Sequence, residues 1–222
     1  MPRLFASRLD AGWRLAKALE AYRGGNPLVL AIPRGAVAMG AVVAEALGGE
    51  LDVVLVRKLR SMFSPELAVG AVDESGWTYV ADEAPMMGAT PEHLARERRT
   101  QLATLAERRA QYTPARASVD PRGRIAIVVD DGIATGASMI AALHAVRAKH
   151  PARLVCAVPV APRESLARIR RYADEVVCLE TPDDFQTVGQ FYGEFPQVED
   201  EEVVKLLAAP SARGHALPAA SP

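Results

Sequence analysis

The sequence predicts an α/β fold, an open parallel sheet flanked by helices, with a small α+β excursion of a hairpin and a long helix in the middle. Short apolar runs of strand length alternate with segments whose apolar residues recur at helical spacing. The connections are short, so consecutive strands are expected to run parallel with right-handed crossovers. The chain has 222 residues, half of them hydrophobic, which is enough for one core without disulfide bonds.

Each element of the parallel pattern is marked by its apolar spacing and by the residues that end it. Residues 9–23 repeat apolar side chains at helical spacing and stop at Gly24 and Gly25, which predicts a first helix. The apolar run Leu-Val-Leu-Ala-Ile predicts the first buried strand. The expected strands are 28–32, 51–56, 124–129, 153–159 and 174–179, and the expected helices are 9–23, 36–47, 137–149 and 163–171.

The middle of the chain departs from this alternation. Two short apolar runs, 68–72 and 77–80, flank the turn residues Asp-Glu-Ser-Gly, which predicts a β-hairpin. Residues 91–111 predict a long, strongly charged helix. Acidic and basic side chains interleave along it, which favours a solvent-exposed face over an Arg-rich ligand patch. The inward-facing positions of this helix are expected to be Leu94, Leu102 and Leu105.

This departure divides the chain into expected parts. Residues 1–57 and 123–208 are expected to form the α/β core, and residues 58–122 an inserted hairpin-plus-helix subdomain. The tail 209–222 consists mostly of Ala, Pro, Ser and Gly, has little to bury and is expected to be disordered. Just before the tail, a short amphipathic helix is expected to bury Val203, Leu206 and Leu207.

Composition narrows the class of protein. The net charge of −1 gives no reason to expect a nucleic-acid or membrane partner, and no apolar stretch has the length of a membrane span. The Arg-containing N-terminus lacks a continuous apolar core, so an ordinary first helix is favoured over a targeting peptide. Cys156 and Cys178 lie in apolar runs and are expected to be core residues in a reducing, cytoplasmic setting.

Residues 125–139 are the most informative segment. The apolar run Ile-Ala-Ile-Val-Val ends in Asp130 and Asp131, and a short loop of Gly, Thr, Ala and Ser leads into a helical pattern. A phosphate at such a helix start can take backbone N–H groups and the hydroxyls of Thr135 and Ser138. The adjacent carboxylates suit a polyol or a divalent metal. The segment therefore predicts a sugar-phosphate site rather than a plain helix cap.

The run 125–139 resembles the signature of the type I phosphoribosyltransferases, which bind 5-phosphoribosyl 1-pyrophosphate. The resemblance implies that Asp130 and Asp131 hold the ribose hydroxyls, with Mg²⁺ nearby. Some members of that family carry an Asp at the position of Ala134 and use it as a base toward a purine. Its absence here disfavours a hypoxanthine/guanine-type mechanism and leaves adenine-type and other acceptors open. The residues that would hold the 5-phosphate are Ala134, Thr135, Gly136, Ala137 and Ser138.

The loop after the first strand, Pro-Arg-Gly at 33–35, fits the pyrophosphate loop of that family. Gly35 allows a close backbone approach, and the following helix offers free N–H groups. The alternative is a plain strand–helix turn. The resemblance also implies a non-proline cis peptide next to Arg34 or Gly35. The substrate-binding residues expected here are Arg34 and Gly35.

Cations follow the second expected strand. Arg57 and Lys58, with Arg60 close behind, would suit a pyrophosphate that must be neutralised before it leaves. Lys58 is the strongest single choice and is assigned a catalytic role with Asp130 and Asp131. Surface cations whose stems cover apolar residues are the alternative.

The segment 181–195 holds several aromatic residues in a chain that is only 5% aromatic. Its counterpart in purine phosphoribosyltransferases packs an aromatic ring on the acceptor, and Phe185 fits that place best. A hydrophobic lid or a dimer contact is the competing interpretation. The mobile loop that closes the site is expected at 60–66 or in the hairpin, and Glu66 is a candidate acid/base group.

Together these features predict transfer of the phosphoribosyl group from phosphoribosyl pyrophosphate to a nitrogenous acceptor, most simply a nucleobase, with Mg²⁺ and release of pyrophosphate. A homodimer is expected. One alternative is a non-catalytic regulator that binds phosphoribosyl pyrophosphate or nucleotides. Another is a pyrophosphokinase or a phosphoribohydrolase with the same cradle. A dinucleotide-dependent oxidoreductase is disfavoured, because no Gly-x-Gly-x-x-Gly follows the first strand.

Overall fold

The computed structural model describes residues 3–64, 67–112, 114 and 117–209. Five strands form a parallel sheet in the order β2-β1-β6-β7-β8, and three form an antiparallel sheet in the order β3-β4-β5. The strands are β1 (Leu28–Ala31), β2 (Glu50–Val53), β3 (Val56–Arg60), β4 (Ala68–Asp73), β5 (Thr78–Val80), β6 (Ile125–Val129), β7 (Arg153–Val160) and β8 (Glu175–Glu180). The predicted fold class, a parallel sheet flanked by helices, is confirmed.

The helices follow the predicted order closely. They are α1 (Arg8–Ala18), α2 (Ala36–Leu47), α3 (Pro91–Tyr112), α4 (Ala137–Arg147), α5 (Arg163–Ile169) and α6 (Asp200–Ala208), with short 3-10 turns η1 (Glu20–Tyr22), η2 (Ala84–Met87) and η3 (Val188–Phe191). None of the helices in the described part of the chain has the length and apolarity needed to cross a membrane. The predicted disordered tail begins at residue 209, and its residues 210–222 lie outside the described part.

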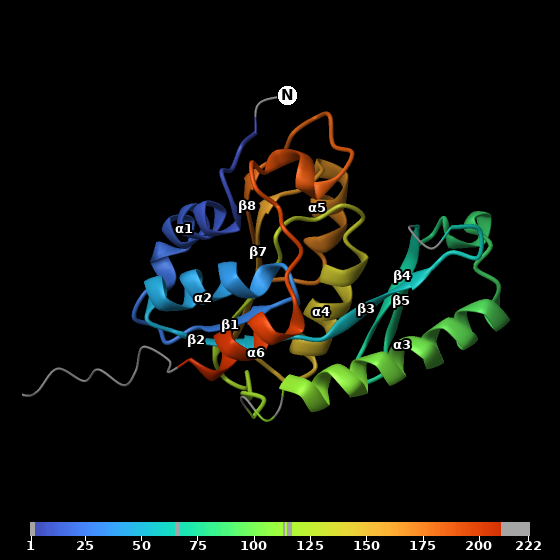
Figure 1. Ribbon diagram of the computed structural model, residues 1–222, viewed down its shortest axis with the longest axis horizontal. Coiled ribbons are helices and arrows are strands. Elements are labelled where there is room, and N and C mark those ends of the chain that lie inside the picture. The colour runs from blue at the N-terminus through green and yellow to red at the C-terminus, as the bar shows by residue number, and fades with distance from the viewer. Residues whose placement is uncertain (1–2, 65–66, 113, 115–116, 210–222) are drawn as a thin grey trace, which may run out of the picture.

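The parallel sheet is buried on both faces, which explains its unbroken apolar strands. Along β6, Ala126 and Val128 enter one core while Ile127 and Val129 enter the other. Strand β1 alternates in the same way, and so does β7 from Leu154 to Val158, as expected for side chains that point to opposite faces in turn. Helices α1 and α2 lie on one side of this sheet and α4 and α5 on the other (Figure 1).

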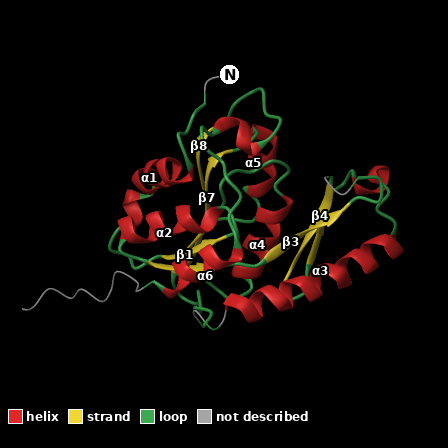
Figure 2. Cartoon of the chain, viewed as in Figure 1, coloured by secondary structure: helices red, strands yellow, loops and turns green. Residues whose placement is uncertain are grey.

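The small antiparallel sheet projects from this core together with α3 (Figures 1 and 2). Helix α3 packs along β3 and β4, and α4 contacts all three strands of the small sheet. Leu105 of α3 is buried, whereas Leu94 and Leu102 are only partly buried against the same core. The small sheet therefore packs against α4, the helix that begins at the predicted phosphate loop.

The single strand predicted at 51–56 is wrong. Val53 pairs with Ala31 in the parallel sheet and ends β2, whereas Val56 pairs with Asp73 in the antiparallel sheet and begins β3. The apolar run continues across the gap because both sheets bury their share of it, so hydrophobicity alone does not show the change of sheet. The predicted domain boundary at residue 57 accordingly falls inside β3.

Candidate active site

The loops after β1 and β6 emerge side by side at the carboxyl edge of the parallel sheet. Ala31 pairs with Val129, and the amide of Ile32 donates to the Val129 carbonyl at 3.0 Å. The loops line one cavity of about 530 Å³. The predicted site residues that line it are Arg34, Gly35, Lys58, Asp130, Asp131, Ala134, Thr135, Gly136, Ala137 and Ser138.

The loop 134–138 has the geometry of an anion cradle. Gly136 directly precedes α4 with φ of 87°, a left-handed conformation that favours glycine. The Ile140 amide donates to the Gly136 carbonyl at 2.9 Å and so begins the hydrogen-bond ladder of the helix. The N–H groups before it have no carbonyl partner inside the helix and are available to an anion.

Helix α5 holds this cradle from behind. The Ser165 hydroxyl donates to the Ala134 carbonyl at 2.6 Å, and the Arg168 guanidinium donates to the Thr135 carbonyl at 3.3 Å. Ser165 is almost completely buried, so its bond is shielded from water. Because α5 binds carbonyl oxygens of the loop, the N–H groups and hydroxyls of the loop remain for a ligand in the cavity.

The two acids differ in how they are held. Asp131 accepts a hydrogen bond from Arg8 Nε at 2.8 Å, and the two side chains are only 15% and 12% exposed. Asp130 accepts one from the Asp131 amide at 2.9 Å. An added Cβ at Gly35 would lie 2.2 Å from the Asp131 carboxylate. The close approach of the two loops therefore requires glycine at position 35.

Electrostatics also separate the two acids. Burial, and then the neighbouring charge of Asp131, raise the pKa of Asp130 well above its ordinary value. Burial also raises the pKa of Asp131, but the bond from Arg8 opposes that rise. Within the described residues, no three His, Cys, Asp or Glu side chains form a metal-binding group. A cation at these acids would therefore need further oxygen ligands from the substrate.

The loop 33–35 contains the expected cis peptide, between Pro33 and Arg34. The side chain of Arg34 forms ion pairs with Glu199 at 3.3 Å and with Asp200 at 3.4 Å. Asp200 also accepts a short hydrogen bond from Tyr112, the last residue of α3. The start of α6 is thus tied both to the candidate pyrophosphate loop and to α3.

Lys58 and Arg57 do not share one environment. Both lie within β3, rather than after a strand of the parallel sheet, where the sequence pattern places them. Lys58 is exposed and lines the main cavity. Arg57 turns toward α3 and donates to Gln101 at 2.9 Å, so it is absent from that cavity lining. Alternation along the strand explains the difference.

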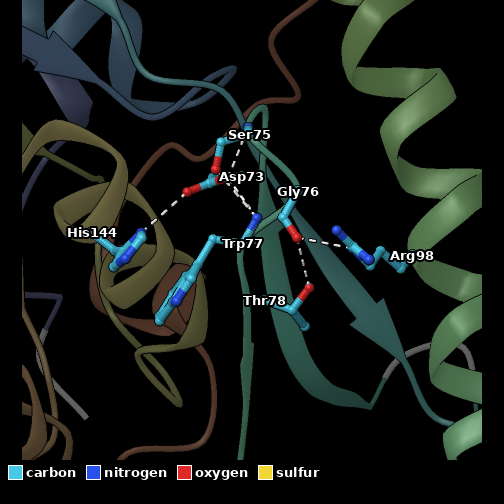
Figure 3. Close-up of polar contacts among 7 residues, drawn as sticks. All are labelled: Asp73, Ser75, Gly76, Trp77, Thr78, Arg98 and His144. Carbon is cyan, nitrogen blue, oxygen red and sulfur yellow. Dashed lines mark hydrogen bonds and ion pairs between the residues drawn. The ribbon is translucent and has the colours of Figure 1, made fainter. Parts of the chain in front are cut away.

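A polar cluster fixes the small sheet against α4 (Figure 3). Asp73 is fully buried and accepts hydrogen bonds from the amides of Ser75 and Trp77. Its other oxygen lies 3.4 Å from Nδ1 of His144 on α4, whose ring stacks on Trp77 at 3.7 Å. Arg98 of α3 donates to the Gly76 carbonyl at 2.9 Å. The end of β4 is thereby anchored to the helix that begins at the cradle, and β4 pairs with β3, the strand that carries Lys58.

The aromatic segment contributes a different ring from the predicted one. Phe185 packs against Phe191 with ring centroids 5.1 Å apart, and it does not line the cavity. The segment 195–198 and Val188 line the cavity instead. Arg8 lies 3.6 Å from the centre of the Phe195 ring and donates to the Pro196 carbonyl at 2.6 Å. The predicted role of Phe185 therefore has no support in the geometry.

Arg8 is the main residue that sequence reasoning missed. It begins α1, 123 positions from Asp131, and no local pattern links the two. Tyr192 was missed for the same reason, and its hydroxyl donates to the Asp131 carbonyl at 2.5 Å. The candidate acid/base group Glu66 lies outside the described residues, as does Pro65 of the candidate closing loop.

Residues 8–194 match the phosphoribosyl transferase domain. The chain belongs to the phosphoribosyl transferase domain family. It is 44% identical over 207 residues to two Mycobacterium tuberculosis proteins, from strains H37Rv and CDC 1551, whose names class them provisionally as phosphoribosyl transferases. The match covers 92% of this chain and 46% of each relative, so the chain spans about half the length of those relatives.

A solved structure shows the same fold across nearly the whole chain. The crystal structure of TT1426 from Thermus thermophilus shares 44% sequence identity, with a TM-score of 0.77. The likeness covers 94% of this chain and 98% of that one. The family match ends at residue 194, so Phe195 and α6 lie beyond it, although both contact residues of the cavity.

Proposed function

We propose that this chain transfers the phosphoribosyl group of phosphoribosyl pyrophosphate to a nitrogenous acceptor, a nucleobase in the simplest case, and releases pyrophosphate. One observation carries the proposal. A single cavity joins an anion cradle at 134–138, two carboxylates suited to ribose hydroxyls, and a second loop at 33–35. That arrangement matches a ligand with a phosphate at one end, a sugar in the middle and a pyrophosphate at the other end.

The protein's part in this reaction is to position and to stabilise charge. The cradle fixes the 5-phosphate, and the acids orient the ribose so that the anomeric carbon faces the loop 33–35. Lys58 and the N–H groups of that loop stabilise the negative charge that develops on the departing pyrophosphate. No covalent nucleophile is needed, because the pyrophosphate leaves as positive charge builds on the ribose ring.

Mg²⁺ fits the acids as a bound partner of the substrate. Burial and the charge of Asp131 both disfavour the charged form of Asp130 and raise its pKa, and a bound cation would oppose this effect. Mg²⁺ prefers oxygen ligands and usually keeps several waters, which suits a site with two carboxylates, ribose hydroxyls and phosphates. When bound, it would supply further positive charge for the leaving pyrophosphate.

The acceptor is expected on the side of the cavity lined by Val188 and the segment 195–198. Displacement at the anomeric carbon brings the nucleophile to the face opposite the leaving group. Position 134 is an exposed Ala, so the loop offers no carboxylate to take a proton from a purine. The acceptor must be nucleophilic without that base, as an adenine-type ring or an amine is.

Calorimetry with phosphoribosyl pyrophosphate and Mg²⁺ tests the proposal directly. The wild-type chain is expected to bind the donor, and Asp131→Asn to bind it roughly 10- to 150-fold more weakly, since a hydrogen bond to a charged group contributes about 1.5–3 kcal/mol. Asp120→Asn, at an exposed position away from the cavity, is the matched control.

A pyrophosphate-release screen over nucleobases and amines then identifies the acceptor. Donor binding without any turnover would favour the regulator, and a requirement for ATP would favour a pyrophosphokinase. Equal affinity of D131N and wild type would contradict the ribose role of the acids. A homodimer and a cytoplasmic location are also proposed, and sedimentation of the purified chain tests the first.

A further inference from the structure

A second cavity of about 290 Å³ opens beside the first. The two cavities share Ile32, Pro33, Lys58 and Ser138 in their linings, so the second continues from the candidate pyrophosphate loop. The new residues come from β3, β4 and α3, outside the parallel sheet. The cations that line the second cavity are Arg57, Lys58, Arg60 and Arg108, and no acidic side chain among the described residues lines it.

The charges of Arg60 and Arg108 lie near that of Arg57. Burial lowers the pKa of Arg57, and the nearby charges of Arg108, Arg60 and Arg34 lower it further. Glu97 opposes this effect, but more weakly than burial or any of these three arginines promotes it. The charges of Arg60 and Arg108 are therefore close enough to that of Arg57 to repel it, which agrees with the shared cavity lining.

None of these cations forms an ion pair with an acid of the described chain. Arg57 is held by the neutral amide of Gln101, which itself donates to Glu97 at 2.9 Å. Within residues 3–64, 67–112, 114 and 117–209, the side chains of Lys58, Arg60 and Arg108 form no hydrogen bond or ion pair. Most other arginines of the fold, such as Arg8 and Arg34, are paired with acids.

Several unpaired cations around one cavity attract an anion with several charges. A guanidinium binds phosphate oxygens through two parallel hydrogen bonds, and four cations match a chain of phosphates better than one phosphate. The loop 33–35 and Lys58 already serve a pyrophosphate in the first cavity. Arg60 and Arg108 line the second cavity but not the first, which the proposed donor occupies.

We propose that the second cavity binds the far end of a triphosphate chain whose near end occupies the pyrophosphate loop. The proposal rests on the proposed function for the near end only, since the cations of β3 and α3 are independent of the ribose site. A triphosphate bound in this way would exclude phosphoribosyl pyrophosphate, because both need Lys58 and the loop 33–35. Inorganic tripolyphosphate and nucleoside triphosphates share this chemistry and are the two sources of such a chain.

Calorimetry without divalent metal, with tripolyphosphate, pyrophosphate and orthophosphate, tests the site. Wild type is expected to bind tripolyphosphate most tightly, and Arg60→Gln and Arg108→Gln are each expected to weaken that binding roughly tenfold or more. Binding of ribose 5-phosphate should be unchanged in both variants. Arg99→Gln removes the same charge from an exposed position of α3 that lines neither cavity, so it is the matched control.

Further arms separate the outcomes. Arg108→Lys is expected to recover part of the affinity, because it keeps the charge and loses the fork. A nucleoside triphosphate that binds more tightly than tripolyphosphate identifies a nucleotide as the source, and equal binding identifies the phosphate chain alone. Equal affinity of wild type, R60Q and R108Q, or an equal loss in R99Q, would overturn the proposal. Failure of the donor to bind, with the tripolyphosphate results intact, would overturn only the proposed transferase function.

Discussion

The floor of the main cavity, formed by Asp130, Asp131 and the loop 134–138, differs from the cationic second cavity in how its side chains are held. On the floor, packing and hydrogen bonds fix the groups: Arg8 holds Asp131, and Ser165 holds the loop at Ala134. In the second cavity, the side chains of Arg60 and Arg108 form no hydrogen bond or ion pair with any residue of the described chain. The first is held in place by the protein itself, whereas Arg60 and Arg108 of the second would be held by the anion that we propose to bind there.

Gly35→Ala should give the largest effect, since it breaks the preorganised region directly. Its Cβ would lie 2.2 Å from the Asp131 carboxylate, so one of the two loops must move. A displaced Asp131 would lose its hydrogen bonds to the ribose, and at about 1.5–3 kcal/mol for a bond to a charged group we expect a loss of roughly 10- to 150-fold in affinity for phosphoribosyl pyrophosphate. Titration calorimetry measures it.

Two variants separate this collision from general damage. Gly123→Ala places a side chain at a left-handed position with open space around it, so it should lower stability by about 1–2 kcal/mol and leave donor binding unchanged. Gly35→Ala combined with Asp131→Ala removes the collision together with the ribose contact, so it should not recover donor binding. If Gly35→Ala alone kept the wild-type affinity for phosphoribosyl pyrophosphate, the loops at the floor could adjust, and the proposed difference in rigidity between the two cavities would be wrong.

The preorganised region is also the part that the sequence shows best. Its apolar strand, the two acids and the cradle at 134–138 are contiguous, so local spacing and the helix start were enough to predict them. What completes the site comes from distant segments. Arg8 and Phe195 meet over Asp131 through α1 and the segment after η3, and neither carries a local signal of that contact.

The second cavity could not be predicted from the sequence, because it too depends on segments that are distant along the chain. Charges that interleave along α3 predict an exposed face, and Arg99 is indeed exposed. Arg108 lies on the same helix yet lines a cavity, because the small sheet packs against that part of α3. Helical periodicity predicts on which face of the helix a residue lies, but not which element packs against that face. The element here is the small antiparallel sheet, and the sequence did not show that a new sheet begins between Val53 and Val56.

Asp130→Asn should give an intermediate effect of unusual sign. The pKa of Asp130 is raised in the folded chain by burial and by Asp131. As pH rises above about 3.9, the ordinary Asp value, the unfolded chain loses this proton before the folded chain does, so the free energy of unfolding falls. D130N does not titrate there, so without ligand it should be more stable than wild type at pH 7.

Urea unfolding between pH 4 and pH 8 measures this difference. The stability gap between D130N and wild type should grow with pH and then level off, while D130N binds phosphoribosyl pyrophosphate more weakly. Asp120→Asn, at an exposed residue, should show no such gap. A gap that shrinks with rising pH would mean that the fold stabilises the charged form of Asp130. Burial and the charge of Asp131 would then not destabilise the folded chain.

His144 joins the two regions, and its variants should give the smallest effect. His144→Phe keeps a ring on Trp77 and loses the 3.4 Å contact with Asp73, whereas His144→Ala loses both. Because His144 is partly exposed and Asp73 keeps its bonds from the hairpin amides, we expect H144F to lower the free energy of unfolding by at most about 1 kcal/mol and H144A by about 0.5–1.5 kcal/mol more.

Affinity for ribose 5-phosphate should stay at the wild-type value in both variants, since α5 holds the cradle independently. Tripolyphosphate should bind more weakly to H144A alone, because that variant loosens β4 against α4, and β4 pairs with the strand β3 that carries Lys58 and Arg60. An equal loss for both ligands would show that the junction also shapes the cradle, and the two regions would then act as one site.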